Sequence, residues 1–144
     1  MSTMDTGKLC PTSGQTTNIT ARLATCTHKD CPRYGGPGCV CNIRELNDRF
    51  RTTMSGGLVH MTNGIAALGL ATVNAIFLAV SQFNAFTADN DPYGEHDCAV
   101  MEAEGQRIIW KIDYYDRSRT CHSPDAADPK VTVRILTVML ASEY

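Results

Sequence analysis

The sequence predicts an α+β domain with two helices packed on a small antiparallel sheet of about four strands, preceded by a Cys-rich N-terminal tail. Three patterns lead to this prediction. Apolar residues recur at helical spacing over residues 43–54, residues 64–80 carry no charge, and apolar and polar residues alternate along residues 107–115. A chain of 144 residues with 43% hydrophobic content suits one packed domain.

The predicted domain spans residues 42–144, and residues 1–41 form a separate Cys-rich tail or small metal-binding segment. Cysteine and histidine are the side chains that hold structural zinc. The segment contains five of them close together, with Pro and Gly turns between: Cys26, His28, Cys31, Cys39 and Cys41. Their spacing matches no standard zinc finger, so a tail whose thiols bind no metal is the alternative.

The cysteine count and the N-terminal sequence predict a cytoplasmic protein. Seven cysteines are an odd number, and the N-terminus lacks a basic start followed by an apolar core. Residues 64–80 approach the length of a membrane span, but they contain two glycines and polar residues. Their apolar positions follow one helical face: Val73, Ile76, Phe77, Val80 and Phe83. We therefore expect a buried helix of a soluble domain, with a membrane span as the minor alternative.

The first helix is predicted to begin at Asn42 as N-cap, with Glu45 completing a capping box. Its core-facing stripe consists of Ile43, Leu46, Phe50 and Met54, and Gly56-Gly57 ends it. Residues 58–62 are then a short strand, and Asn63-Gly64 is the turn after it.

A hairpin follows, with strands over residues 98–101 and 107–115 and a turn at Glu104-Gly105. Trp110 lies on the apolar face of the returning strand and is expected to anchor the core. Residues 131–140 are β-branched and apolar on both faces, which predicts a central strand.

Residues 89–97 gather acidic side chains and an imidazole around a predicted type I turn at Asp91-Pro92-Tyr93-Gly94. The crowded groups are Asp89, Asp91, Glu95, His96 and Asp97. Carboxylates this close repel one another unless a cation or hydrogen-bond donors compensate. The pattern therefore favours either a metal site or an acid/base pair on His96, and the alternative is a set of turn-capping carboxylates.

A two-residue turn at Glu104-Gly105 also fixes which residues face each other across the hairpin. Cys98 then lies opposite Lys111, and the same register extended outward places His96 opposite Asp113. A carboxylate on one ring nitrogen would orient the other as a base or a metal ligand. A purely structural His96–Asp113 pair is the equal alternative.

Several motifs resemble an uncharacterised bacterial family, common in alphaproteobacteria, plasmids and prophages. They are Leu46-Asn47-Asp48-x-Phe50-Arg51, Asn90-Asp91-Pro92-x-Gly94-Glu95-His96-Asp97, Trp110-Lys111-Ile112-Asp113-Tyr114-Tyr115-Asp116, Ser123-Pro124-Asp125 and the segment from Arg134 to Tyr144. The likeness covers residues 43–144 and implies a small cytoplasmic accessory protein of mobile DNA, without an assigned activity or cofactor. The chain departs from the family's pattern in residues 1–41 and at Cys98.

Three functions compete. The first is a protein-binding module that inhibits a host protein, one of its defence proteins in that setting. It would bind through an acidic and aromatic surface, since residues 89–128 carry ten acids against four bases and aromatic residues favour interface cores. The residues expected on this surface are Asp91, Tyr93, Asp97, Lys111, Tyr114, Tyr115 and Asp116.

The second function is a metal-dependent hydrolase in which His96, Asp113 and Glu95 are catalytic and Asp89 and Asp91 help to hold a hard cation. The third is a nucleic-acid binder that works through a zinc-bound form of the basic segment 1–41. A host protein is thus the expected partner and nucleic acid the alternative. Zinc in the Cys-rich segment is the expected cofactor, and the hydrolase hypothesis requires a hard cation as well.

Overall fold

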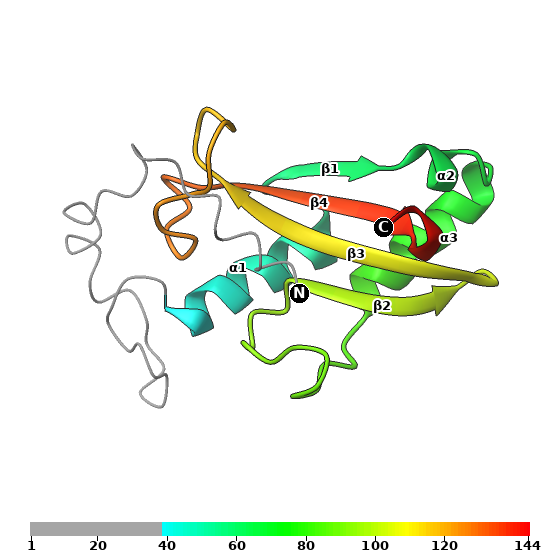
Figure 1. Cartoon of the computed structure of the whole chain (residues 1–144), viewed down its shortest axis with the longest axis horizontal. Coiled ribbons are helices and arrows are strands. Elements are labelled where there is room, and N and C mark those ends of the chain that lie inside the picture. Colours follow the sequence, from blue (N-terminus) through cyan, green and yellow to red (C-terminus); the bar gives the residue numbers. More distant parts are fainter. Residues whose placement is uncertain (1–38) are drawn as a thin grey trace.

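The computed structural model describes residues 39–144, which form one four-stranded sheet and helices on it (Figure 1). This confirms the predicted α+β class. The elements in chain order are α1 (Val40–Thr53), β1 (Leu58–Met61), α2 (Asn63–Ala66), α3 (Leu70–Gln82), β2 (Cys98–Ala103), β3 (Gln106–Tyr115), β4 (Val133–Leu140) and the short helix η3 (Ala141–Glu143).

The sheet has the order β1-β4-β3-β2 and is mixed, whereas a wholly antiparallel sheet was predicted. The β2–β3 and β3–β4 pairs are antiparallel, but β1 runs parallel to β4, with Leu58 opposite Ile135. Helices and a hairpin separate β1 from β4, so no tight turn sets their relative direction. The central position predicted for β4 is confirmed.

The β2–β3 hairpin has the predicted register. Glu104 and Gly105 have φ values of 52° and 74°, the two positive angles that a type I′ turn requires. Ala103 consequently pairs with Gln106, and the ladder runs back to Cys98 opposite Lys111. The turn at Glu104-Gly105 was therefore sufficient to predict the register of this hairpin.

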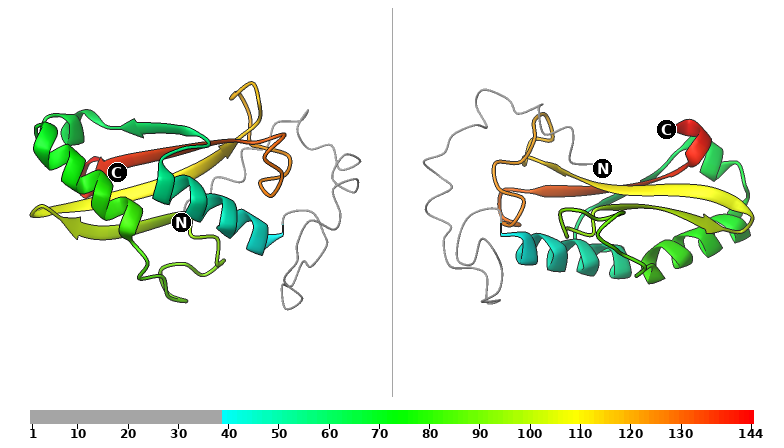
Figure 2. Two further views of the ribbon diagram at one scale, coloured as in Figure 1. Left: turned by 180° about the vertical axis from the view of Figure 1, so that it is seen from behind. Right: turned by 60° about the horizontal axis from the view of Figure 1, so that its bottom comes forward.

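One face of the sheet holds the core. Helices α1 and α3 both lie on this face, one beyond the other along the sheet, and their C-terminal ends approach each other (Figure 2). Trp110 is fully buried there, as predicted. The core combines the apolar stripe of each helix with alternate residues of the strands, namely Ile43, Phe50, Val73, Ile76, Val80, Ile108, Trp110, Ile112, Leu136 and Val138. Gly57 lies so close to the Phe50 ring that a Cβ atom would collide with it.

Two predicted helix boundaries were wrong. Helix α1 begins at Val40 after Cys39, and no side chain caps it, so Asn42 lies inside the helix and the capping box does not form. The expected single helix over residues 64–80 is two helices, because Gly69 takes a φ of 95° that breaks the helical path. Asn63 and Gly64, predicted as a turn, open α2.

Helix α3 is buried along one side only. Val73, Ile76 and Val80 face the core, whereas Leu70 and Leu78 are 77% and 58% exposed. No helix within residues 39–144 is long and apolar enough to cross a membrane.

Candidate functional site

The acidic loop between α3 and β2 folds back against α1 through its own turn. The backbone carbonyl of Asp91 accepts a hydrogen bond from the backbone N–H of Gly94, with 3.0 Å between the oxygen and the nitrogen. This bond confirms the predicted turn. Its carboxylate accepts the N–H groups of Glu95 and His96, each at 3.2 Å from Oδ1. Asp91 is therefore a buried turn organiser, and its side chain points into the loop.

His96 is held on both sides by carboxylates. Its Nδ1 lies 2.9 Å from Oδ1 of Asp48 on α1, and its Nε2 lies 3.6 Å from Oδ2 of Asp91. The Phe86 ring stacks on the imidazole at 3.8 Å between centroids, nearly parallel. Asp48, Asp91 and His96 form what we call the outer clip, because it joins the loop to α1 near the surface.

Arg51 anchors the outer clip to the end of α3. Its Nη1 donates to the carbonyls of Val80 and Phe83, both at 2.9 Å, and its Nη2 donates to Asp48 at 3.1 Å. Helix α3 ends at Gln82, so the guanidinium satisfies carbonyls at a helix C-terminus, where a cation is favoured. The guanidinium also lies 5.0 Å from the centre of the Trp110 ring.

A second group of polar side chains lies deeper. Asn47 donates to the Tyr114 hydroxyl at 2.8 Å, and that hydroxyl donates to Glu95 at 2.9 Å. Arg134 Nε donates to Asn47 at 2.7 Å, and its guanidinium lies 5.1 Å from the centre of the Tyr114 ring. Asn47, Glu95, Tyr114 and Arg134 form what we call the inner network.

Burial changes the titration of the inner network. It raises the pKa of Glu95 above its ordinary value of 4.5; the hydrogen bond from Tyr114 opposes this rise, and Asp97 and Asp91 add to it. Burial, reinforced by the charge of Glu95, raises the pKa of Tyr114 well above 10.0. Burial also lowers the pKa of Arg134. These are the shifts expected where charges are taken out of water into a connected set of hydrogen bonds.

The predicted partner of His96 was wrong. The β2–β3 ladder stops at Cys98, and beyond it the Ile112 N–H donates to the carbonyl of Asp97 at 2.7 Å. His96, with a φ of 55°, turns toward Asp48 instead of continuing the strand. Asp113 accepts a hydrogen bond from Lys111 on its own strand.

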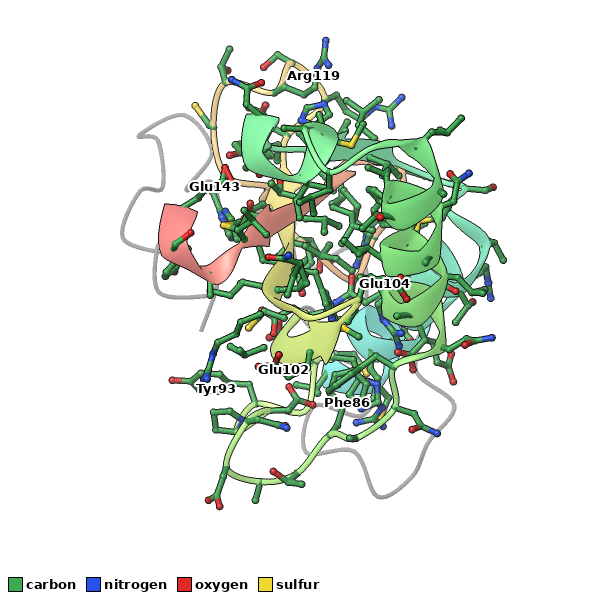
Figure 3. The ribbon with its side chains drawn as sticks, turned by 90° about the vertical axis from the view of Figure 1, so that its right-hand side faces the viewer. Phe86, Tyr93, Glu102, Glu104, Arg119 and Glu143 are labelled. Carbon is green, nitrogen blue, oxygen red and sulfur yellow. The ribbon has the colours of Figure 1, made fainter. Side chains whose placement is uncertain are left out.

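The other predicted site residues are scattered. Tyr93 is 62% exposed and points away from the loop, on the opposite side from Phe86 (Figure 3). Tyr114 and Asp97 are buried, and Tyr115 is half-buried at the end of β3. The Asp116 carboxylate accepts the N–H of Thr120 at 3.1 Å and so closes the next turn.

Of the predicted zinc ligands, Cys39 and Cys41 are buried at the start of α1. Cys26, His28 and Cys31 lie outside the described residues. Within residues 39–144, no three His, Cys, Asp or Glu side chains are arranged to hold a metal ion.

The residues that sequence reasoning missed are the partners of the motif residues. No role was predicted for Asn47, Asp48, Arg51 or Arg134 as hydrogen-bonding residues. A signal was present for three of them, since Asn47 and Arg51 lie on the apolar stripe of α1 and Arg134 shares a face with Leu136. A polar residue on a core face must find a buried partner.

The fold and the two polar groups define a small α+β domain in which an acidic loop is hydrogen-bonded to the first helix and the sheet. The chain belongs to a family described as protein of unknown function (DUF3768), whose model matches residues 61–143. The predicted membership of an uncharacterised family is thus confirmed. Neither a curated protein nor a solved structure matches the chain.

Proposed function

We propose that this chain is a protein-binding module that acts on a host protein. The observation that carries the proposal is a sheet face over which neither α1 nor α3 packs (Figure 2). Its residues alternate with the buried ones along β3 and along β4 as far as Thr137, whereas Met139, the next residue on the same face, is buried. We call it the open face and define it as Ile109, Lys111, Asp113, Tyr115, Val133, Ile135 and Thr137.

The composition of the open face supports a protein partner. Ile109, Tyr115 and Ile135 provide apolar and aromatic area around the Lys111–Asp113 ion pair. Non-obligate protein interfaces have this mixture of apolar and polar area, with aromatic residues enriched in their centres. The charges of Lys111 and Asp113 offset each other, so the surface suits a partner that carries both positive and negative groups. Two residues predicted for binding, Lys111 and Tyr115, lie here.

The use of the motif residues within the fold also favours binding over catalysis. Nδ1 of His96 is hydrogen-bonded to Asp48, and Nε2 faces the carboxylate of Asp91 at 3.6 Å, so the imidazole points toward groups of its own chain. Glu95 is hydrogen-bonded to Tyr114, and Asp113 to Lys111. These are the three residues that the hydrolase hypothesis needs as catalytic groups. The acids of residues 89–128 do not form one acidic surface either, because Asp91, Asp97 and Asp125 are buried.

In the setting that the family resemblance implies, the partner is a defence protein of the host, and binding inhibits it. A photo-crosslinking amino acid placed at Tyr115 or at Ile135 of the full chain, in the cells that carry its gene, identifies the partner. The same residue placed at the exposed hairpin position Glu104 is the control. We expect one host protein to be crosslinked from both open-face positions and not from the hairpin.

The purified pair then tests the surface. We expect Ile135→Lys, which places a cation opposite Asp113, to weaken binding at least about tenfold while circular dichroism shows the variant folded, and Glu104→Lys to change nothing. Crosslinks to the host protein from the hairpin alone, or an affinity insensitive to Ile135→Lys, would contradict the proposal.

A further inference from the structure

We infer that the outward face of α3 is a self-association surface through which two copies of this chain dock antiparallel. This goes beyond the proposed function, because the surface lies on the helix layer and not on the open face. It consists of Leu70, Asn74 and Leu78, with Ala71 beside them. Leu70 and Leu78 are among the most exposed large apolar side chains of residues 39–144.

The first argument is the absence of charge. A helix on a protein surface ordinarily turns charged residues to the solvent. The sequence from residue 52 to residue 88 contains no Asp, Glu, Lys or Arg, so α3 and the segments on both sides of it expose none. Interface centres are depleted in charge in this way. A surface without charge also meets its own copy without repulsion between like charges.

The second argument is the symmetry of the pattern. Leu70, Asn74 and Leu78 are spaced four residues apart and therefore lie on one side of the helix. A twofold interface requires that residue i contacts residue j and residue j contacts residue i. With the axis at Asn74, Leu70 of one copy meets Leu78 of the other at both ends. The Asn74 amide has donors and an acceptor, so it can complement its own copy.

The third argument concerns the other occupants of such a face. A helix that lies on a lipid surface usually carries Lys and Arg on its polar side, and α3 carries none. The small side chain of Ala71 allows two helices to approach closely. A 13-residue helix is about 20 Å long, which limits the buried area to that of a weak complex. The inferred dimer is therefore a weak and reversible one.

Sedimentation equilibrium of the full chain over a concentration series tests the inference. We expect a monomer–dimer equilibrium whose dissociation constant rises at least about tenfold in Leu78→Glu. Val100→Glu is the matched control, since it places the same charge on another exposed apolar residue, on β2. Circular dichroism and thermal melting should show both variants folded. A wild-type chain that stays monomeric, or equal effects of the two variants, overturns the inference.

Charge complementation tests the antiparallel arrangement. Leu70→Lys and Leu78→Glu each weaken the dimer, and the double variant Leu70→Lys/Leu78→Glu restores it, because each lysine then faces a glutamate of the other copy. No recovery in the double variant contradicts the antiparallel pairing. Flotation with vesicles of neutral and anionic lipid completes the test. If the chain is monomeric and binds vesicles, and Leu78→Glu abolishes that binding, the face is a lipid-binding surface and the inference is overturned.

Discussion

The outer clip and the inner network join the same segments of the molecule, yet they differ in depth. Asn47 and Asp48 are neighbours on α1, and Glu95 and His96 are neighbours in the loop. One member of each pair turns inward and the other outward. Asn47 is fully buried, whereas the side chains of Asp48 and His96 are 38% and 23% exposed.

The difference shows that burial, and not residue type, decides what these polar groups contribute. Asp48 and His96 of the outer clip are partly solvated, so when the bond between them is lost water can take the vacant place. In the inner network a lost partner leaves a donor or acceptor buried without a bond. We expect the inner network to matter for stability and its pH dependence, and the outer clip to matter mainly for the position of the loop.

The largest effect is expected at Trp110, which packs against Arg51 and Phe86 beneath the outer clip. Trp110→Ala should destabilise the fold by about 3–5 kcal/mol, because it leaves a large cavity in the core. Tyr93→Ala, at an exposed ring of the same loop, should cost at most about 0.5 kcal/mol. Urea denaturation measures both values, and a loss below about 1 kcal/mol at Trp110 would contradict the prediction.

Next in size is Arg134→Met, which tests the inner network directly. The substitution keeps an apolar stem but removes the donors to Asn47 and to the Ala126 carbonyl. We expect a loss of about 3 kcal/mol in the free energy of unfolding. Arg107→Met, at an exposed arginine on β3, is the control and should change stability by less than about 0.5 kcal/mol. Equal losses in the two variants would mean that the network adds nothing.

The inner network also predicts a pH dependence. The pKa of Glu95 is raised in the folded chain, so the folded state keeps its proton to a higher pH than the unfolded state. The stabilisation by this group is complete below 4.5 and is lost as the pH rises through the folded pKa. Glu95→Gln does not titrate, and it should gain stability relative to the wild type as the pH rises from 4.5 through the folded pKa.

Urea unfolding at several pH values measures the difference in the free energy of unfolding between Glu95→Gln and the wild type. If Glu95→Gln instead loses stability relative to the wild type with rising pH, the direction of the shift is refuted.

The smallest effect is expected in the outer clip. His96→Ala removes the bonds to Asp48 and the stacking on Phe86, and should cost about 1–2 kcal/mol. His96 has a φ of 55°, a conformation that glycine adopts without strain. His96→Gly should therefore be less destabilising than His96→Ala by about 0.5–1 kcal/mol. Thermal melting compares the two, and the reverse order would show that backbone strain is not present at this position.

The features that were predicted correctly from the sequence are those that residues close together in the chain determine. The register of the β2–β3 hairpin follows from Glu104-Gly105, and the burial of Trp110 follows from the alternation along β3. The central place of β4 follows from residues that are apolar on both faces. Each of these depends on a few neighbouring residues and needs no knowledge of distant segments.

The predictions that were wrong or missing concern contacts between segments far apart in the sequence. The parallel pairing of Leu58 with Ile135 and the clip between Asp48 and His96 join residues that no turn brings together. His96 also leaves the strand direction through a positive φ, which no pattern of alternation anticipates for histidine. The position of Asn47 on the apolar stripe of α1 indicates that it needs a buried partner, but not that the partners are Tyr114 and Arg134.

The place of β4 in the sheet has a consequence for biosynthesis. Of the described strands it is made last, yet it lies between β1 and β3 and joins them into one sheet. While the ribosome is still translating, the hairpin can close, but β1 lacks the strand it pairs with and Asn47 lacks Arg134. The apolar sides of α1 and α3 thus emerge before their sheet is complete. We expect a nascent chain that relies on chaperones until β4 has left the exit tunnel.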